Sequence, residues 1–157
     1  MEIGARWAGD HDLPLVSALA TQATDELRPR RGGAIWSMLD ARTEPIIDSV
    51  RAELASPAHA LGIGTIDSVG VGYIAAHRLP LHDGRAMARI TDIYVVPDAR
   101  GVGVGEALML LVESWARDQD LIGLDSVALP GDRETKNFFE TFGLVARAIE
   151  VHRPLDS

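Results

Sequence analysis

A run of glycines between an apolar segment and an amphipathic segment is the feature that most limits how this chain can fold. Residues Ala86–Val96 are rich in strand-forming side chains and are followed by Pro97, which predicts a strand that ends there. Residues Gly103–Gln119 place four large apolar side chains on one helical face, namely Leu108, Leu111, Val112 and Trp115. We therefore expect a strand, a tight glycine loop and a helix in direct succession.

This loop has the chemistry of an anion-binding site. Because glycine lacks a Cβ atom, the backbone N–H groups near Gly101, Gly103 and Gly105 can approach a ligand closely. The first turn of the following helix adds unpaired N–H groups and a partial positive charge. Such donors suit a pyrophosphate, and the Arg100 side chain can add a charge-assisted contact. The alternative is a turn that needs its glycines for backbone geometry alone.

Two other phosphate-binding motifs fit the loop less well. The dinucleotide-binding motif requires a glycine where this chain has Glu106. The Walker loop requires a lysine after its last glycine, and the only lysine of the chain is Lys136. A nucleotide- or phosphometabolite-binding protein is therefore the weakest of the functional alternatives.

Hydrophobic periodicity and turn residues predict the remaining elements. We expect strands over five further segments and a hairpin turn at Asp67-Ser68 between the second and third of them; the segments are Glu2–Ala8, Ala58–Ile66, Val69–Leu79, Leu121–Leu129 and Leu144–Arg153. We expect helices to about Leu27, over Ala34–Ala55 with a break at Pro45, and over Asp132–Phe142 before Gly143. This order mixes antiparallel neighbours with one strand-helix-strand crossover, which predicts one α+β domain over residues 1–157 with a mixed sheet.

Composition excludes several functional classes. The chain has no cysteine, which excludes disulfides and a catalytic thiol, and its scattered histidines predict no metal site. The net charge of −8 and the lack of a dense basic cluster argue against nucleic acid as a partner. No apolar run reaches the roughly 18 residues of a membrane span, and the first residues do not resemble a signal peptide. We therefore expect a cytoplasmic protein with no membrane partner.

The segment Arg100-Gly101-Val102-Gly103-Val104-Gly105 is similar to the R/Q-x-x-G-x-G/A loop of GNAT N-acetyltransferases. The preceding Asp92–Pro97 resembles the strand before that loop, and Asn137–Leu144 resembles the family's last helix and its ending. The resemblance implies a mostly antiparallel central sheet that splays at the cofactor site between flanking helices. It also implies transfer of an acetyl group from acetyl-CoA to a primary amine of a small molecule or protein, by direct attack in a ternary complex. Dimers are common in this family, so a homodimer is one expected state.

The same resemblance implies residue roles. Backbone groups of Ile93, Tyr94 and Val95 would bind the acyl-pantetheine arm, and the Val95 amide would polarise the thioester carbonyl. One such donor is often worth about 3–4 kcal/mol at a developing oxyanion. The other implied cofactor contacts are Arg100, Gly101, Val102, Gly103, Val104, Gly105, Glu106, Asp132 and Phe139.

Two positions depart from the family pattern. Members often carry an Asn at the start of the last helix and, seven residues later, a Tyr that protonates the leaving thiolate; here these are Asp132 and Phe139. Phenylalanine has no proton to donate, so Tyr94, Tyr73 or a water would have to replace it. A thiolate with a pKa of about 8.5 can also leave without an acid. The alternative function is a catalytically weak acyl-CoA-binding regulatory domain, and Asp132 fits a helix cap better than a catalyst.

The general base is likewise open. Thr91-Asp92 stands where some related acetyltransferases carry Glu-Asp. Asp92 can accept the amine proton, hold a cationic substrate, or simply bond nearby backbone. Trp36 and Met38 lie in a region that often borders the acceptor pocket, although their residue types favour the core.

Overall fold

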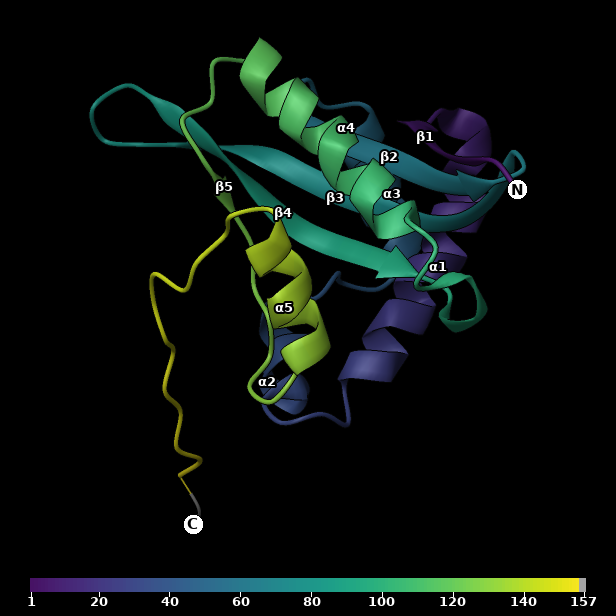
Figure 1. Ribbon diagram of the computed structural model, residues 1–157. Coiled ribbons are helices and arrows are strands. Elements are labelled where there is room, and N and C mark those ends of the chain that lie inside the picture. Colours follow the sequence, from purple (N-terminus) through teal and green to yellow (C-terminus); the bar gives the residue numbers. More distant parts are fainter. Residues whose placement is uncertain (156–157) are drawn as a thin grey trace.

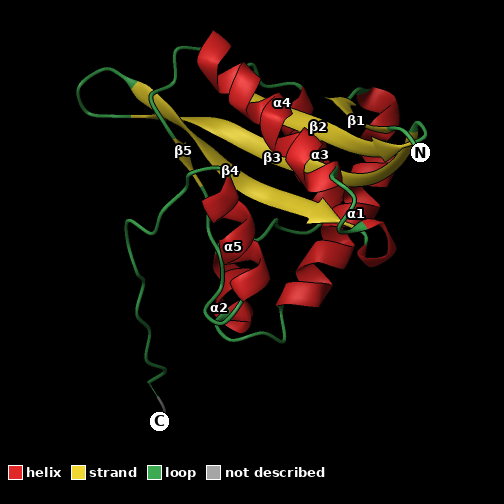
Figure 2. Ribbon diagram, viewed as in Figure 1, coloured by secondary structure: helices red, strands yellow, loops and turns green. Residues whose placement is uncertain are grey.

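Within residues 1–155, which a computed structural model describes, five strands form one sheet in the order β1-β2-β3-β4-β5 (Figures 1 and 2). The strands are β1 (Ile3–Trp7), β2 (His59–Ile66), β3 (Val69–Pro80), β4 (Ala86–Val95) and β5 (Leu124–Asp125). The helices on its two faces are α1 (Leu13–Leu27), α2 (Gly33–Leu39), α3 (Ile46–Leu54), α4 (Val104–Asp118) and α5 (Arg133–Thr141). The fold is α+β, as the element order predicts.

The edge of β4 is only partly covered. Pairing is antiparallel from β1 to β4, and β4 pairs with β5 in parallel. The parallel pairing covers only Ala88 with Leu124 and Arg89 with Asp125, although β4 continues to Val95. Beyond Arg89 the chain that follows β5 moves away from β4 toward α5 (Figure 1). The sheet is therefore mixed, mostly antiparallel and splayed beside the second half of β4, as the resemblance implied.

The sheet separates two hydrophobic cores. One packs against α1 and α3 and includes Val16, Leu19, Val50, Ile63 and Tyr73. The other packs against α4 and α5 and includes Ile74, Ile90, Leu108, Val112 and Phe139. Because side chains alternate along a strand, Tyr94 of β4 packs in the α1 core, whereas Ile93 and Val95 pack against the α4 core.

Most predicted elements are confirmed within a few residues. The hairpin turns at Asp67-Ser68, and the helical region before it is broken at Pro45, which is the N-cap of α3. The helix after the glycine loop begins at Val104. Gly143 follows α5 with a φ of 82°, the left-handed conformation expected of a glycine that ends a helix.

Two predicted strands are wrong. The strand expected over Leu121–Leu129 is reduced to β5, because the chain leaves β4 after Asp125 and has no backbone partner there among residues 1–155. The strand expected over Leu144–Arg153 does not form, and Val145 and Val151 are 80% and 91% exposed. The alternation of apolar side chains is present in this segment, but a strand also needs a paired edge. Side-chain bonds between Arg147 and Asp125 hold the segment near β5 instead.

The hairpin turn between β2 and β3 is strained, which makes its stability testable. Asp67 and Ser68 have φ values of 47° and 68°, the left-handed pair that two-residue hairpin turns require and that favours glycine at the second position. We expect Ser68→Gly to stabilise the protein by about 1 kcal/mol, which is about 2–4 °C in melting temperature for a domain of this size. Ser68→Ala should give no gain, because it removes the hydroxyl without relieving φ. An equal gain from both variants would contradict the argument.

Candidate functional site

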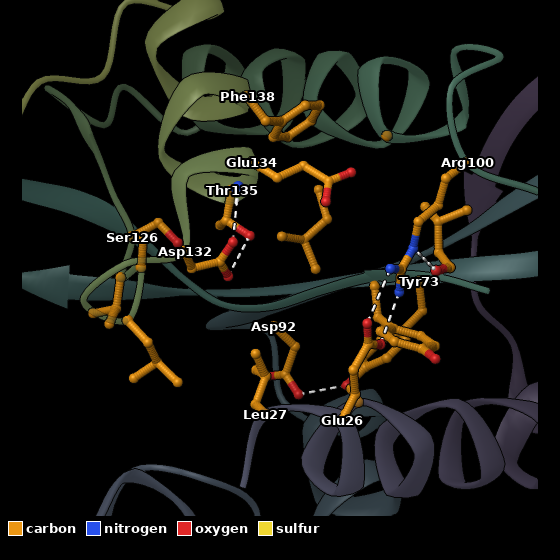
Figure 3. Close-up of a pocket in the computed structure, with 18 of the residues that line it drawn as sticks. Glu26, Leu27, Tyr73, Asp92, Arg100, Ser126, Asp132, Glu134, Thr135 and Phe138 are labelled. Carbon is orange, nitrogen blue, oxygen red and sulfur yellow. Dashed lines mark hydrogen bonds and ion pairs between the residues drawn. The ribbon is translucent and has the colours of Figure 1, made fainter. Parts of the chain in front are cut away.

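A cavity of about 390 Å³ opens where β4 loses its pairing with β5 (Figure 3). Its walls come from the C-terminal part of α1, from α2 and the segment after it, from β4 and the glycine loop, and from α5. Residues Ser126–Leu129 form the wall opposite β4, and the Ser126 hydroxyl donates to the Ile90 carbonyl oxygen at 3.1 Å. The cavity therefore reaches both layers of helices through the gap in the sheet.

The glycine loop presents backbone donors to this cavity. Gly101 and Gly103 have φ values of 83° and 105°, which other residues rarely adopt, and Gly103 is the N-cap of α4. Within residues 1–155, no amide from Gly101 to Glu106 donates a hydrogen bond to the protein. Gly101, Gly103, Val104, Gly105 and Glu106 line the cavity, whereas the exposed Val102 does not. The entrance of α4 is thus an open set of donors, as an anion site requires.

The approach of α5 to this loop depends on Gly105. A Cβ atom at Gly105 would lie 3.1 Å from the ring of Phe138, closer than ordinary contact. Phe138 lines the cavity, whereas Phe139 is buried in the core beside α4 and does not line it. The aromatic residue at the cavity is therefore the neighbour of the one that the sequence motif singled out.

Arg100 connects the loop to β4 and α1. Its Nε atom donates to the Val95 carbonyl oxygen at 2.7 Å, and its terminal nitrogens donate to the Glu26 carboxylate at 3.0 and 2.8 Å. The guanidinium also lies 5.3 Å from the centre of the Tyr94 ring. The hydrogen bond from Arg100 lowers the pKa of Glu26, so the pair stays ionised near neutral pH. The guanidinium is already bonded to protein acceptors, and its predicted contact with a pyrophosphate stays a prediction.

The open edge of β4 offers a second set of donors. The Val96 amide donates to the Val71 carbonyl oxygen of the neighbouring segment at 2.9 Å. Because inward and outward groups alternate along an antiparallel strand, the amide of Tyr94 also points toward β3, and those of Ile93 and Val95 point toward the gap. The bond from Arg100 to the Val95 carbonyl agrees with this orientation.

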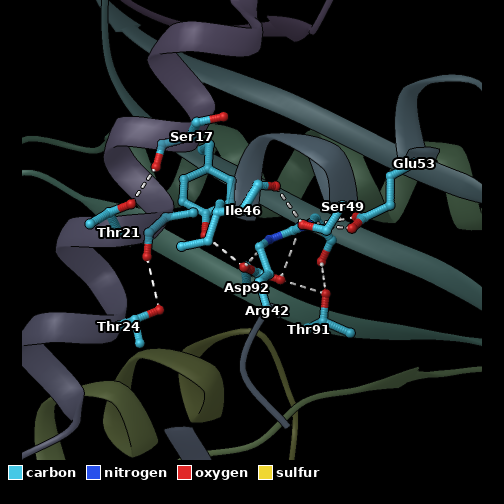
Figure 4. A network of polar contacts seen from close by, with 12 residues as sticks. Ser17, Thr21, Thr24, Arg42, Ile46, Ser49, Glu53, Thr91 and Asp92 are labelled. Carbon is cyan, nitrogen blue, oxygen red and sulfur yellow. Dashed lines mark hydrogen bonds and ion pairs between the residues drawn. The ribbon is translucent and has the colours of Figure 1, made fainter. Parts of the chain in front are cut away.

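Asp92 lies at the centre of a network of polar side chains beside the cavity (Figure 4). Arg42, from the segment between α2 and α3, donates to its two oxygens at 2.9 and 3.3 Å. The Tyr73 hydroxyl donates at 2.6 Å and the Thr91 hydroxyl at 2.7 Å. Both carboxylate oxygens of Asp92 thus already accept hydrogen bonds from the protein, and its role as a general base or amine-binding group stays a prediction. The alternative prediction, that Asp92 bonds to nearby backbone, is wrong, because all four donors belong to side chains.

The same network fixes the ionisation of its members. Burial, reinforced by the charge of Asp92, raises the pKa of Tyr73 well above its usual value, so the phenol keeps its proton. Burial alone would lower the pKa of Arg42, but the carboxylates of Asp92 and Glu53 more than offset it and raise the pKa. Arg42 is therefore a permanent cation, and it also donates to Glu53 at 3.0 Å.

Asp132 caps α5, as its position predicted. Its carboxylate accepts from the Thr135 amide at 3.2 Å and from the Thr135 hydroxyl at 2.8 Å. Its side chain also lines the cavity, and a terminal nitrogen of Arg30 lies 3.5 Å from its carboxylate. Any cofactor contact by Asp132 would be additional to this capping role.

Trp36 and Met38 do not belong to the core, so that expectation was wrong. Trp36 lines the cavity from α2, and Met38 is exposed because it lies on the other face of this short helix. Sequence reasoning also missed Arg42 and Glu26. Arg42 bonds to Asp92, 50 residues away, and Glu26 bonds to Arg100, 74 residues away. No local sequence pattern predicts such pairs.

No helix of the described chain combines the length and apolar character that a membrane span needs. Residues 1–155 likewise contain no group of three His, Asp or Glu side chains arranged to hold a metal ion.

Comparison with known proteins gives a family match and several related folds. The model of the Acetyltransferase (GNAT) family matches residues 22–144. A search of curated proteins found no match.

Among solved structures, AAC(6')-Iy in complex with the bisubstrate analogue CoA-S-monomethyl-acetylneamine is 15% identical, with 100% of both chains covered and a TM-score of 0.78. A ribosomal-protein-alanine N-acetyltransferase from Brucella melitensis biovar Abortus 2308 is 17% identical, with 99% of this chain and 100% of that chain covered and a TM-score of 0.73. The aminoglycoside acetyltransferase HMB0005 from an uncultured soil metagenomic sample is 15% identical, with the same coverage and a TM-score of 0.75. At these identities the likeness establishes a shared fold.

The network around Asp92 makes a prediction about stability. Replacing Arg42 with Met leaves two largely buried carboxylates without their cation, and we expect a loss of about 3–5 kcal/mol in unfolding free energy at pH 7. Urea unfolding at pH 7 measures this loss.

The triple variant Arg42→Met, Asp92→Asn, Glu53→Gln is the control and should recover part of the stability. A triple variant that is no more stable than the single variant would contradict the assignment.

Proposed function

This chain belongs to the Acetyltransferase (GNAT) family, and we propose that it transfers an acetyl group from acetyl-CoA to a primary amine of a small molecule or protein. The observation that carries the proposal is that two sets of unpaired backbone donors open into one cavity. One set is the loop from Gly101 to Glu106, and the other is the edge of β4 at Ile93 and Val95. A ligand with a diphosphate at one point and an amide-rich arm beyond it would satisfy both.

The glycine loop would hold the diphosphate of coenzyme A. Backbone amides at the entrance of α4 and the partial positive charge of that helix favour an anion there. Charged side chains contribute less, because Arg100 is already paired with Glu26. The pantetheine arm would then run along the open edge of β4, between that strand and residues Ser126–Leu129.

The two faces of β4 would divide the cavity between the substrates. Ile93 and Val95 face α4 and α5, on the side where the loop would hold the cofactor. Asp92 and Tyr94 face the opposite layer, with Tyr73, α1 and α2. The acceptor amine would enter from this second side and meet the thioester in the gap. We call these parts the cofactor half and the acceptor half.

The rate of the reaction would depend mainly on how the two substrates are positioned relative to each other. The amine nitrogen would attack the thioester carbonyl carbon, the C–S bond would break with coenzyme A leaving as its thiolate, and the nitrogen would release its extra proton to water. The Val95 amide would stabilise the oxyanion that forms at the carbonyl oxygen. Holding both substrates in one cavity supplies the proximity that the uncatalysed reaction lacks. A supply of acetyl-CoA is required, which agrees with a cytoplasmic location.

A second candidate is an acyl-CoA-binding regulatory domain with weak catalysis. It is favoured by the lack of a tyrosine at 139 and by the four donors that already occupy Asp92. Both candidates predict binding of coenzyme A, and only the first predicts release of its free thiol with some amine in a panel. The Phe138→Tyr variant separates them further, because Phe138 lines the cavity and turnover that appears only in that variant would favour the regulatory domain.

The cofactor site is tested by Gly103→Asp, which places a carboxylate among the amides that would bind the diphosphate. We expect calorimetry to show at least a 100-fold weaker affinity for coenzyme A. Gly84→Asp is the matched control, because Gly84 also has a positive φ of 88° but lies in the β3–β4 turn, away from the cavity. Tight binding by the Gly103 variant would count against the site.

The oxyanion donor is tested by Val95→Pro, which removes one amide that points into the gap. Proline is tolerated at an unpaired strand edge, so the fold and the affinity for coenzyme A should be largely kept. We expect kcat to fall about 100- to 1,000-fold, the usual effect of removing one such donor. An unchanged kcat would show that this amide does not act on the carbonyl.

A further inference from the structure

The ionic cluster of Arg42, Asp92 and Glu53 has more negative than positive charge. One guanidinium serves two carboxylates, which gives the cluster a formal charge of −1. The cluster is largely buried, since the side chains of Arg42, Glu53 and Asp92 are only 7%, 17% and 18% exposed. An excess charge in such a place is costly unless a counter-charge lies beside it.

The described chain does not supply that counter-charge. Within residues 1–155, Arg42 is the one cation within ion-pair distance of Asp92 or Glu53. The charge of Glu53 acts on His77, but burial and neighbouring His59 lower the pKa of His77. His77 is therefore neutral near pH 7 and does not balance the cluster.

The cluster meets solvent space on two sides. Glu53 lines a separate, smaller cavity of about 190 Å³, whereas Arg42 and Asp92 line the acceptor half of the 390 Å³ cavity, which is the side that a substrate would reach. Two further groups at the same end suit a cation. The exposed Asp40 carboxylate has no ion-pair or hydrogen-bond partner among residues 1–155, and the half-buried Trp36 adds an indole ring.

A cation beside Asp92 cannot itself be the nucleophile. An amine held against the cluster would be kept protonated, and a protonated amine has no lone pair with which to attack the thioester. Asp92 and Val95 are also three residues apart on an extended strand, about 10 Å along its axis. The group beside Asp92 and the group that reacts near Val95 must therefore be different parts of the acceptor.

We propose that the acceptor carries a second positive charge besides the amine that is acetylated, and that this charge binds beside Asp92. The acceptor is then a diamine or polyamine-like molecule with its two nitrogens separated by a flexible chain. This inference rests on the proposed function for the identity of the reaction, but the binding of the second charge can be measured without it.

The test compares three acceptors of similar length: 1,6-diaminohexane, hexylamine and 6-aminohexanoate. With saturating acetyl-CoA, we expect kcat/KM to fall at least tenfold from the diamine to hexylamine, mostly through KM. It should fall further for 6-aminohexanoate, whose carboxylate would meet the excess negative charge. Equal values for the diamine and hexylamine would overturn the inference.

Glu53→Gln separates the effect of charge from the effect of contact. It brings the cluster to a formal charge of zero without changing a residue that lines the 390 Å³ cavity. We expect the preference for the diamine over hexylamine to drop about tenfold in this variant. Glu113→Gln is the matched control, because it also removes one negative charge but lies on α4, paired with Arg117, and should leave the preference unchanged. An undiminished preference in the Glu53 variant would contradict the role of the cluster.

A binding measurement keeps the inference distinct from the proposed function. Calorimetry would follow 1,6-diaminohexane and hexylamine binding to the protein loaded with coenzyme A, which has no acetyl group to transfer. Tighter binding of the diamine that is lost in Glu53→Gln, without turnover of any amine, would support the inference and refute the acetyltransferase. Turnover of amines with no preference for the diamine in either assay would do the reverse.

Discussion

The candidate site depends on the short pairing between β4 and β5, which covers only two residues of each strand. β4 continues for six residues after its last pairing with β5, and in the described part of the chain no strand lies beside its outer backbone groups there. Backbone N–H groups that lie away from bulk water need partners, and a folded chain rarely leaves a row of them unmet. Here the row lies next to a helix entrance whose first amides are also unbonded, and both open into the same cavity. The fold thus keeps a set of fixed donors for a ligand, which we propose to be acetyl-CoA.

Side-chain charges hold this backbone frame in place. Arg100 ties the glycine loop to α1 through Glu26 and to β4 through the Val95 carbonyl. On the other face of the strand, Arg42 ties the segment between α2 and α3 to Asp92. Each arginine is held by acceptors on separate elements, so the walls of the cavity are fixed before a ligand arrives. The Arg100–Glu26 pair is balanced in charge, whereas the cluster of Arg42, Asp92 and Glu53 has a formal charge of −1. This excess charge is the basis of the proposal that the acceptor carries a second positive charge.

The features that depend on a few adjacent residues were predicted correctly from the sequence. The glycine loop, the start of α4, the Asp132 cap and the turn at Asp67-Ser68 each follow from a few adjacent residues, and all are present. The strands expected over Leu121–Leu129 and Leu144–Arg153 failed because a strand forms only against a partner, which no local pattern reveals. Adjacent helix residues differ by about 100° in direction, so the motif alone could not decide whether position 138 or 139 faces the cavity. The ion pairs that shape the site join residues far apart in the chain, and only the folded structure brings them together.

The central claim is that unbonded amides of the loop and of the β4 edge bind the cofactor. Residue-resolved hydrogen exchange, measured with and without coenzyme A, tests it most directly. The account predicts that coenzyme A slows exchange at the amides of Gly101 to Glu106 and at Ile93 and Val95. The Tyr94 amide, already directed toward β3, should change least. Saturating coenzyme A that leaves the loop amides exchanging as before, or that protects a different surface, would contradict it.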